Sequence, residues 1–285
     1  MTVRALVLGG GGPLGIAWET GVLAGLAEGG VSFADLDLVL GTSAGSVVGS
    51  QIAAGKSPQA MADAELGYAR HSAAAAPASP PDLTPLLAFM MRFPPTGEPD
   101  LGLRRELGAY SLGSQTIAED AFIDVLTSMG LPESWPDGFA CTAVDTASGE
   151  FHVWRKQDGV ALPRAVASSC SVPGIYPAIS INDRKWMDGG MRASVNLDKA
   201  AGCKRVLALA VIPVAMAEPI MRGRVEHEGE AVTEAGGRYE LVSPDAAAME
   251  AFGPNLMDGS RREPALKAGL EQGRREAERV KAFWA

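Results

Sequence analysis

Cysteine and histidine are scarce in this sequence, with three residues of each among 285. Cys141, Cys170 and Cys203 are odd in number and far apart, which excludes a disulfide framework and gives no zinc-ligand spacing. We interpret them as small buried hydrophobic residues. The histidines form no HxxxH or HxxE pattern that would indicate a metal site. We therefore expect neither a metal ion nor another cofactor.

The chain also lacks long apolar runs and an excess of basic residues. No uninterrupted apolar run reaches the length of about 18 residues that a membrane-spanning helix needs. Residues 4–12 lead into a strand and a glycine loop rather than a signal peptide. The formal net charge of -9 argues against nucleic-acid binding and weakly opposes an anionic lipid surface. We expect a cytoplasmic protein without a nucleic-acid partner, while peripheral contact with membranes and the oligomeric state stay open.

Hydrophobic residues are plentiful, at 47% of the chain, which is enough to bury the core of one large domain. Segments with the periodicity of strands alternate with segments that have the periodicity of helices. The sequence therefore predicts an α/β fold and a single domain over residues 1–285.

A serine between glycines follows an apolar run early in the chain. Residues 36–40 predict a short strand, and residues 46–54 predict a helix. Between them, Gly41 and Gly45 frame Ser43 in a GxSxG pattern. On a strand-to-helix turn the serine oxygen projects above the sheet edge, and the N–H groups and dipole of the following helix point at the same place. Ser43 is thus a candidate nucleophile, with a plain glycine-rich turn as the alternative.

A second glycine-rich turn follows the strand predicted over residues 3–8. Here a G-x-G-x-x-G pattern ends at Gly15, and Asp35 lies 20 residues further on, as in dinucleotide-binding folds. Asp35 precedes the next strand instead of closing it, which weakens that interpretation. Neighbouring parallel strands bring their C-terminal loops together, so backbone amides of this turn could instead form an oxyanion hole beside the serine. The candidate donors are Gly10, Gly11 and Gly12. A tight turn without a ligand is the third interpretation.

An acidic residue on a glycine turn ends the second of two predicted hairpins. The first joins residues 139–144 to 151–154, and its His152 is expected on a face of the sheet rather than as a catalytic base. The second delivers the chain to Asp188, followed by Gly189 and Gly190. Such a turn leaves a carboxylate little shielded at a sheet edge, which suits a base that must reach a serine hydroxyl. Asp-Gly is also a common turn pair.

Prolines concentrate between residues 72 and 99, in an insertion that we extend to residue 112. They surround a short apolar island, residues 86–91, and prevent a long regular element. The insertion could form a lid or, through Phe89, Met90 and Met91, the wall of an acyl-chain pocket. The alternative is a surface insertion whose helix packs on the core.

Other segments are expected to be scaffold. Thr116 and Glu119 match a capping box at the start of a helix. Within residues 213–285 we expect loop and helices: a flexible loop over 213–242 and an amphipathic helix over 261–284. We interpret His227, in the loop, as part of a solvated charge cluster.

The glycine loop at 10–15, GTSAG at 41–45 and DGG at 188–190 resemble, in this order and these strand contexts, the patatin-like phospholipase family of serine acylhydrolases. Residues 167–174 also look like the family's segment that precedes the acid. The resemblance covers about residues 3–212 and leaves the C-terminal quarter outside. It implies a three-layer α/β/α fold with a mostly parallel central sheet.

The resemblance also implies a mechanism. The family's nucleophile falls on Ser43, its catalytic acid on Asp188 and its oxyanion amides on the glycines at 10–12, so a Ser-Asp dyad would cleave lipid or other acyl esters as a phospholipase A does. Leu14 stands where the family usually has a basic residue. Without that cation, binding of an anionic phospholipid head group loses support, and an acyl ester is the more secure substrate class.

Three other functions compete with this one. A Ser-His-Asp hydrolase of the α/β-hydrolase fold fits poorly, because Ser43 follows only the second predicted strand and His227 lies in a charged segment. A nucleotide-binding protein would use the glycine loop at 10–15. An inactive lipid-binding relative would keep the serine turn without turnover.

Overall fold

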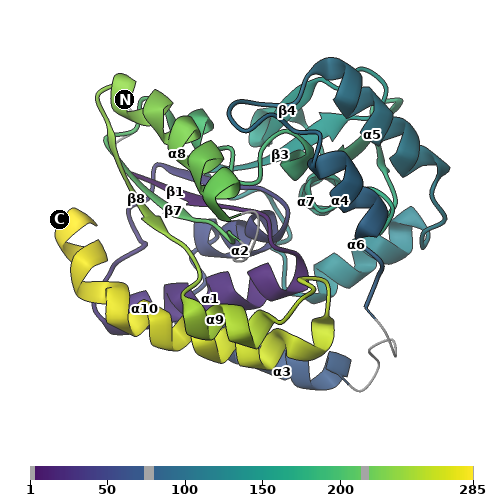
Figure 1. The fold of residues 1–285 in the computed structure, drawn as a ribbon. Helices are drawn as coiled ribbons and strands as arrows, with labels where there is room; N and C mark the ends of the chain where they lie inside the picture. The colour runs from purple at the N-terminus through teal and green to yellow at the C-terminus, as the bar shows by residue number, and fades with distance from the viewer. Residues whose placement is uncertain (1–3, 74–79, 213–217, 285) are drawn as a thin grey trace.

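The computed structural model describes residues 4–73, 80–212 and 218–284. An eight-stranded mixed sheet forms its centre, in the order β5-β6-β3-β2-β1-β7-β8, with β4 paired to β3 outside this path (Figure 1). The pairs β3–β4, β3–β6 and β5–β6 are antiparallel, and the other neighbours are parallel. The strands are β1 (Arg4–Leu8), β2 (Leu38–Gly41), β3 (Phe139–Asp145), β4 (Phe151–Arg155), β5 (Ile179–Ile181), β6 (Arg184–Asp188), β7 (Arg205–Leu209) and β8 (Arg238–Val242).

Helices cover both faces of this sheet, as the three-layer prediction requires. Alternate residues of β1 face opposite layers: Leu6 and Leu8 pack in the larger core with α1, α2 and α10, whereas Ala5 and Val7 pack in a smaller core under α8. The helices are α1 (Gly12–Glu28), α2 (Ala44–Ala53), α3 (Pro58–Ala73), α4 (Thr84–Met90), α5 (Leu101–Gly113), α6 (Glu119–Ser128), α7 (Leu162–Ser169), α8 (Glu218–Glu234), α9 (Ala246–Phe252) and α10 (Arg262–Trp284). The prediction of an α/β/α fold is confirmed.

The register of the parallel strands brings several loops to one edge of the sheet. Leu8 of β1 pairs with Gly41 of β2 on one side and with Leu209 of β7 on the other. The chain therefore leaves β1 into the glycine loop and leaves β2 into the serine turn at the same level. Open α/β sheets bind their ligands at the C-terminal ends of such parallel strands.

The C-terminal helix belongs to the main helical layer. α10 lies along α1 (Figure 1), and a Cβ added to Gly21 of α1 would lie 2.2 Å from the carbonyl oxygen of Leu266. The Trp18 indole N–H donates to Gln272 Oε1 at 3.0 Å in the same interface. The amphipathic helix predicted over 261–284 is thus confirmed, and its backbone approaches α1 closely.

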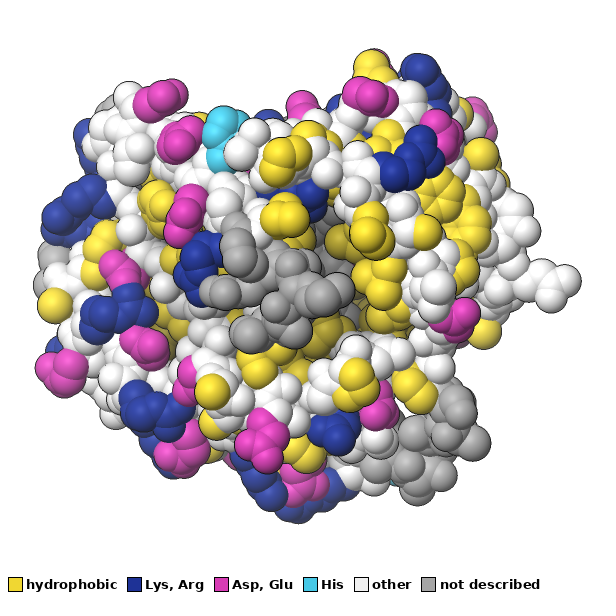
Figure 2. Space-filling model, viewed as in Figure 1, with side chains coloured by type: hydrophobic (Ala, Val, Ile, Leu, Met, Phe, Trp, Pro, Cys, Tyr) yellow, Lys and Arg dark blue, Asp and Glu magenta, His cyan; other side chains and the backbone are white. Residues whose placement is uncertain are grey.

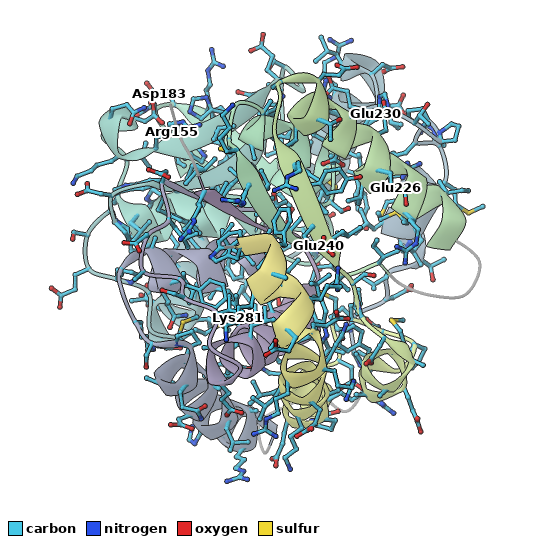
Figure 3. The ribbon with its side chains drawn as sticks, turned by 90° about the vertical axis from the view of Figure 1, so that its left-hand side faces the viewer. Arg155, Asp183, Glu226, Glu230, Glu240 and Lys281 are labelled. Atoms are coloured by element: carbon cyan, nitrogen blue, oxygen red, sulfur yellow. The ribbon has the colours of Figure 1, made fainter. Side chains whose placement is uncertain are left out.

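Two sequence predictions about local structure are wrong. Residues 218–234 and 238–242, expected as a flexible loop, form α8 and the edge strand β8, while residues 213–217 of that prediction lie outside the described residues. Figure 3 shows this edge: Glu226 and Glu230 project from α8, and Glu240 projects from β8.

The second error concerns the start of α6. The helix begins at Glu119 with Ala118 as its N-cap, so Thr116 does not cap it. Glu119 instead accepts hydrogen bonds from the Ser180 N–H at 2.9 Å and from the Ser180 hydroxyl at 3.0 Å. This carboxylate therefore holds α6 against the β5–β6 hairpin.

The proline-rich insertion contributes α4 and α5, which pack on a separate cluster of apolar side chains. Phe89 and Met90 lie against this cluster, which includes Leu107 and Met187, whereas Met91 is 88% exposed. In Figure 2 hydrophobic side chains gather over the part of the molecule where α4 to α6 lie in Figure 1. The packing matches the alternative of a surface helix on the core, while motion as a lid stays a prediction. Among the described residues, no helix is long and apolar enough to cross a membrane.

Candidate active site

Ser43 occupies a strained turn between β2 and α2. Its backbone angles are φ 53° and ψ -119°, in a region that non-glycine residues rarely adopt. A Cβ at Gly41 would lie 2.4 Å from the Cα of Ser46, and a Cβ at Gly45 would lie 2.2 Å from the carbonyl oxygen of Leu8. Steric contact therefore explains both glycines of the GxSxG pattern, and the turn has the geometry of a nucleophile elbow.

Three side chains hold the backbone of Ser43 in this conformation. The Ser43 N–H donates to Ser169 Oγ at 3.0 Å. The Ser43 carbonyl oxygen accepts from the Ser46 hydroxyl at 2.6 Å and from the Cys170 thiol at 3.2 Å. Ser169 and Cys170 belong to residues 167–174, a segment that resembles the family in sequence but whose role the sequence does not indicate. In the structure these two side chains hold the backbone of Ser43, and a strained turn persists only where its surroundings fix it.

Asp188 ends β6 beside this turn. Its side chain is 2% exposed, its Oδ1 accepts from the Gly190 N–H at 2.7 Å, and its buried Oδ2 has no hydrogen-bond partner among the described residues. Burial raises the pKa of Asp188 to about 7, against smaller lowering effects of the Ser43 side chain and the Gly190 N–H. Asp188 and Ser43 are thus neighbours, although no hydrogen bond of normal length joins their side chains. A buried carboxyl group of this pKa can accept and release a proton near neutral pH.

The glycine loop lies next to Ser43 and opens α1. A Cβ at Gly10 would lie 3.4 Å from the Cβ of Ser43, and one at Gly15 would lie 3.1 Å from the Cβ of Ala44. The Gly10 N–H already donates to the Ser194 carbonyl at 2.7 Å, so it is not available to an oxyanion in this conformation.

Three other amides remain open at this edge. Within the described ranges, no acceptor is found for the N–H groups of Gly11 and Gly12, which cap and begin α1. The same holds for the N–H of Ala44, the first residue of α2, which the sequence reasoning did not single out. Two helix N-termini therefore bring free donors to the edge of the sheet at which Ser43 lies.

Asp35 does not support the nucleotide-binding interpretation. It is exposed in the loop that precedes β2, whereas the glycine loop follows the C-terminal end of β1. Because β1 and β2 are parallel, the two lie at opposite edges of the sheet. Asp35 cannot take the place of a ribose-binding acid beside this loop.

An apolar cavity of about 40 Å³ adjoins Ser43. It has room for a few water molecules, so an acyl chain enters only if the lining side chains move. No residue of the apolar island (residues 86–91) lines this cavity. The lining residues are Gly12, Pro13, Ile16, Ser43, Ala44, Phe122, Val125, Leu126, Met129, Cys170, Val172, Tyr176 and Arg262.

Arg262, one member of a buried ion pair, forms part of this wall. Arg262, at the start of α10 and 2% exposed, donates to both carboxylate oxygens of Glu65, at 2.7 Å and 2.8 Å. Its guanidinium group also lies over the Tyr68 ring, 4.8 Å from the centroid. The pair places a neutralised cation next to an otherwise apolar cavity.

His152 and His227 make their contacts elsewhere in the fold. His152 on β4 packs against Trp154, with ring centroids 4.2 Å apart, and His227 on α8 contacts Glu230 at 2.8 Å. No group of three His, Cys, Asp or Glu side chains within the described part of the chain could hold a metal ion.

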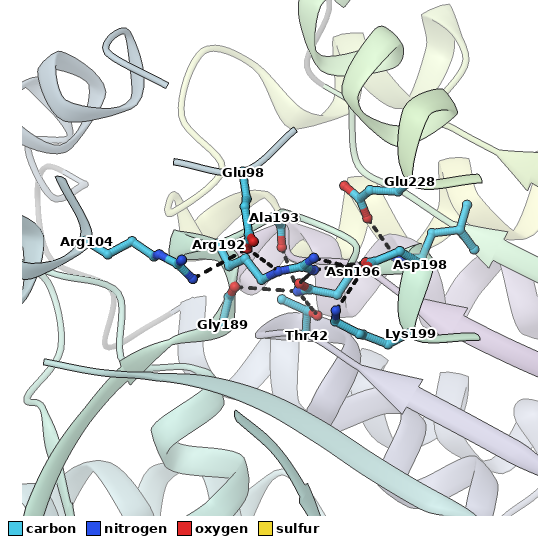
Figure 4. A network of polar contacts seen from close by, with 11 residues as sticks. Thr42, Glu98, Arg104, Gly189, Arg192, Ala193, Asn196, Asp198, Lys199 and Glu228 are labelled. Carbon is cyan, nitrogen blue, oxygen red and sulfur yellow. Dashed lines mark hydrogen bonds and ion pairs between the residues drawn. The ribbon is translucent and has the colours of Figure 1, made fainter. Parts of the chain in front are cut away.

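A network of polar contacts, for which the sequence gives no signal, lies next to the turns of Ser43 and Asp188 (Figure 4). The Asn196 amide donates to Thr42 Oγ1 at 3.0 Å, and Thr42 Oγ1 lies 2.9 Å from Thr142 Oγ1. Gly189, which follows Asp188, sits so close to this group that an added Cβ would lie 2.1 Å from Thr142 Oγ1. The network therefore connects the serine turn with the turn of the acid.

A family model described as patatin-like phospholipase matches residues 6–201, and no curated protein matches the sequence. Among solved structures, VipD from Legionella pneumophila is similar at 12% identity and a TM-score of 0.46, over 98% of this chain and 67% of that one. The type III effector protein ExoU is similar at 14% identity and a TM-score of 0.42. This chain, matched over 98% of its length, spans 53% of ExoU.

Proposed function

Because this chain belongs to the patatin-like phospholipase family, we propose that it hydrolyses carboxylic ester bonds of lipids through an acyl intermediate on Ser43. The family assignment supports lipid hydrolase activity in general. The observation that carries the finer proposal is the juxtaposition of a strained serine turn with the buried carboxyl group of Asp188, whose pKa lies at about 7.

In the proposed reaction Asp188 acts as the general base. It takes the hydroxyl proton of Ser43 while Ser43 Oγ attacks the ester carbonyl carbon. The negative charge that develops on the carbonyl oxygen is stabilised by the free N–H groups of Gly11 and Gly12, with Ala44 as a further donor. The leaving alcohol takes the proton from Asp188 as the ester C–O bond breaks.

Water completes the cycle. Asp188 removes a proton from a water molecule that attacks the acyl group on Ser43, and the proton then passes to Ser43 Oγ as the carboxylic acid leaves. No step requires a histidine. Gly10 contributes by its close contact with Ser43 instead of by its amide, since that amide is bonded to Ser194.

The acyl chain is proposed to enter the apolar cavity between α1 and α6. Val125 and Met129 line it, and Val125 is 41% exposed, so movement of α6 side chains would admit a chain. Leu14 is fully buried and offers no cation for a head group. Acyl esters are therefore the proposed substrate class, and peripheral contact with a lipid surface stays a prediction.

The first test uses a fluorophosphonate probe, which reacts with activated serines. We expect mass spectrometry to find one adduct on Ser43 in folded protein, and hydrolysis of p-nitrophenyl butyrate and of phosphatidylcholine vesicles to stop with it. Asp188→Asn is expected to lower kcat by at least about 100-fold. His227→Ala, matched as a titratable residue outside the site, is expected to keep wild-type rates.

Each alternative has its own outcome. Loss of activity in His227→Ala with retention in Asp188→Asn would show a histidine-dependent hydrolase. Lipid binding without an adduct or turnover would show an inactive relative. Micromolar binding of a dinucleotide, with no adduct on Ser43, would favour the nucleotide-binding interpretation.

A further inference from the structure

Asn196 lies between the two turns that carry Ser43 and Asp188. It is fully buried just before the short 3-10 helix η3 (Leu197–Ala200), in the left-handed conformation with φ 58° and ψ 37°. Asparagine tolerates that conformation better than most residues do. The backbone thereby turns the amide side chain towards the interior, where Figure 4 shows it among the contacts of both turns.

The nitrogen of this amide makes all the contacts with the turns. Nδ2 donates to Thr42 Oγ1 at 3.0 Å, to the Ala193 carbonyl at 2.7 Å and, at the limit of a hydrogen bond, to the Gly189 carbonyl at 3.5 Å. Thr42 immediately precedes Ser43, and Gly189 immediately follows Asp188. One amide group thus touches the neighbours of both residues of the proposed dyad.

The orientation of the amide is fixed from the other side. Arg192 donates to Asn196 Oδ1 at 2.8 Å, so the oxygen faces the guanidinium group and the nitrogen faces the turns. Arg192 is itself held by Asp198, at 2.9 Å and 2.8 Å, and by Glu98 at 2.6 Å. Glu98 also lies 3.5 Å from Arg104 of α5, which extends the network into the insertion.

We propose that Asn196 is a positioning residue, oriented by Arg192, that sets the separation of Ser43 and Asp188. This inference rests on the proposed function, because it concerns the geometry of that dyad. Asn196 does not touch substrate. Its effect is transmitted through Thr42 and Gly189, and a misplacement of about 1 Å in such a pair lowers turnover by about 100-fold.

Two substitutions test the proposal in the full-length protein. Asn196→Gly keeps the left-handed backbone without strain and removes the side chain. Asn196→Asp keeps the size and the contact with Arg192 but places an oxygen against the carbonyls of Ala193 and Gly189, so their hydrogen bonds are lost. Asn182→Gly is the matched control, since Asn182 also has a positive φ, of 49°, but is exposed in the β5–β6 turn.

The measurements are kcat and KM for p-nitrophenyl butyrate. The maximal rate is divided by the number of serine sites that a fluorophosphonate has labelled once labelling is complete, which gives kcat per labelled site. We expect both Asn196 variants to lose about 10- to 100-fold in kcat per labelled site, with KM within about threefold of wild type. Asn182→Gly is expected to match wild type in both constants. A purely structural role would lower only the number of labelled sites.

Wild-type kcat per labelled site in both Asn196 variants would therefore overturn the proposal. So would a rise in KM at unchanged kcat, because that pattern reports loss of substrate binding. A wild-type protein that neither labels at Ser43 nor hydrolyses an ester would instead refute the proposed function itself. If Asn196→Gly does not fold, kcat per labelled site of Asn196→Asp alone tests the proposal.

Discussion

Replacing Ser43 by glycine is expected to make the protein more stable than replacing it by alanine, although both changes abolish hydrolysis. The reason lies in the backbone of the turn, where Ser43 has φ 53° and ψ -119°. Both substitutions remove the hydroxyl group, so the loss of its contacts cancels in the comparison. What differs is the Cβ atom, which alanine keeps and glycine lacks.

The size of the difference follows from two opposing terms. A non-glycine residue in such a region is strained by about 1–3 kcal/mol. Glycine releases that strain but gains about 0.4–1 kcal/mol of conformational freedom in the unfolded chain, which opposes folding. Ser43→Gly is therefore expected to exceed Ser43→Ala in unfolding free energy by up to about 2.6 kcal/mol, with a central value of about 1.3 kcal/mol, or a few degrees in melting temperature.

Equilibrium unfolding in urea, followed by circular dichroism, measures this difference. Glycine and alanine variants at two other positions serve as controls, one with a positive φ and one inside a helix. At Asn182, where φ is 49°, glycine is expected to be more stable than alanine as well. At Ser50, inside α2, glycine is expected to be about 1 kcal/mol less stable than alanine, as in any helix interior.

The reasoning fails if Ser43→Gly proves no more stable than Ser43→Ala while both control pairs behave as expected. The turn would then carry no strain, and a nucleophile elbow could not be inferred from its angles. The expected result would show that stability has been given up at the residue proposed to attack the substrate, as is common at active sites.

Three further predictions concern the titration of Asp188 and the burial of an ion pair. The value of kcat/KM is expected to rise with pH through about 7, because burial raises the pKa of Asp188 to about 7 and the base must be ionised; a flat pH–rate profile would contradict this. A raised folded-state pKa also means that the contribution of Asp188 to stability is fully present below about pH 4 and is lost as the pH rises through about 7. Asp188→Asn should therefore reduce the fall in urea-unfolding free energy over that window, while Glu228, whose pKa burial also raises to about 7, continues to contribute to that fall. Glu65→Leu or Arg262→Leu alone is expected to destabilise the protein by about 3–5 kcal/mol by leaving a buried charge unpaired. The double variant should lose much less than the sum, and additive losses in a double-mutant cycle would refute the pairing.

Short-range signals in the sequence were sufficient to predict the turns of the proposed dyad. GTSAG and the glycine turn after Asp188 each lie within a few residues, so each motif can be found without knowledge of the fold. The contacts that require Gly45 and Gly189 nevertheless come from the distant residues Leu8 and Thr142. The order of the motifs then indicated the family, which the match over residues 6–201 confirms. That Ser43 and Asp188 carry the reaction stays a proposal.

Long-range polar contacts could not be predicted in the same way. Asn196 and Thr42 are 154 residues apart, and nothing near either residue in the sequence marks it as a partner of the other. Arg192 likewise resembles a solvated surface residue in the sequence, whereas in the fold its side chain is only 10% exposed and pairs with Asp198. The oxyanion donors show the same limit, because the Gly10 amide is engaged by Ser194, a residue from another part of the chain.

α8 escaped prediction because only a narrow stripe of it is buried. Val225 and Val232 are buried in the smaller core, whereas charged side chains such as Glu226 and Glu230 face solvent on the same helix (Figure 3). Two valines seven residues apart give too weak a periodic signal among so many charges. The helix is stabilised by tertiary contacts, including the hydrogen bond from the Leu197 N–H to Glu228 at 2.6 Å.

In the sequence Leu14 stands where the family usually has a basic residue, but in the structure this position is in the interior. Its side chain is fully buried, and its N–H faces the Leu256 carbonyl at 3.4 Å, so a basic residue here would have to bury its charge. The same C-terminal segment reaches the cavity: a Cβ at Gly12 would lie 2.6 Å from Met257 Sδ, and Arg262 forms part of the wall. These residues lie beyond the matched range of 6–201. An acyl chain that enters this cavity would therefore meet a surface to which Arg262, outside the matched range, contributes, and selectivity among acyl esters is expected to depend on this residue as well as on the family domain.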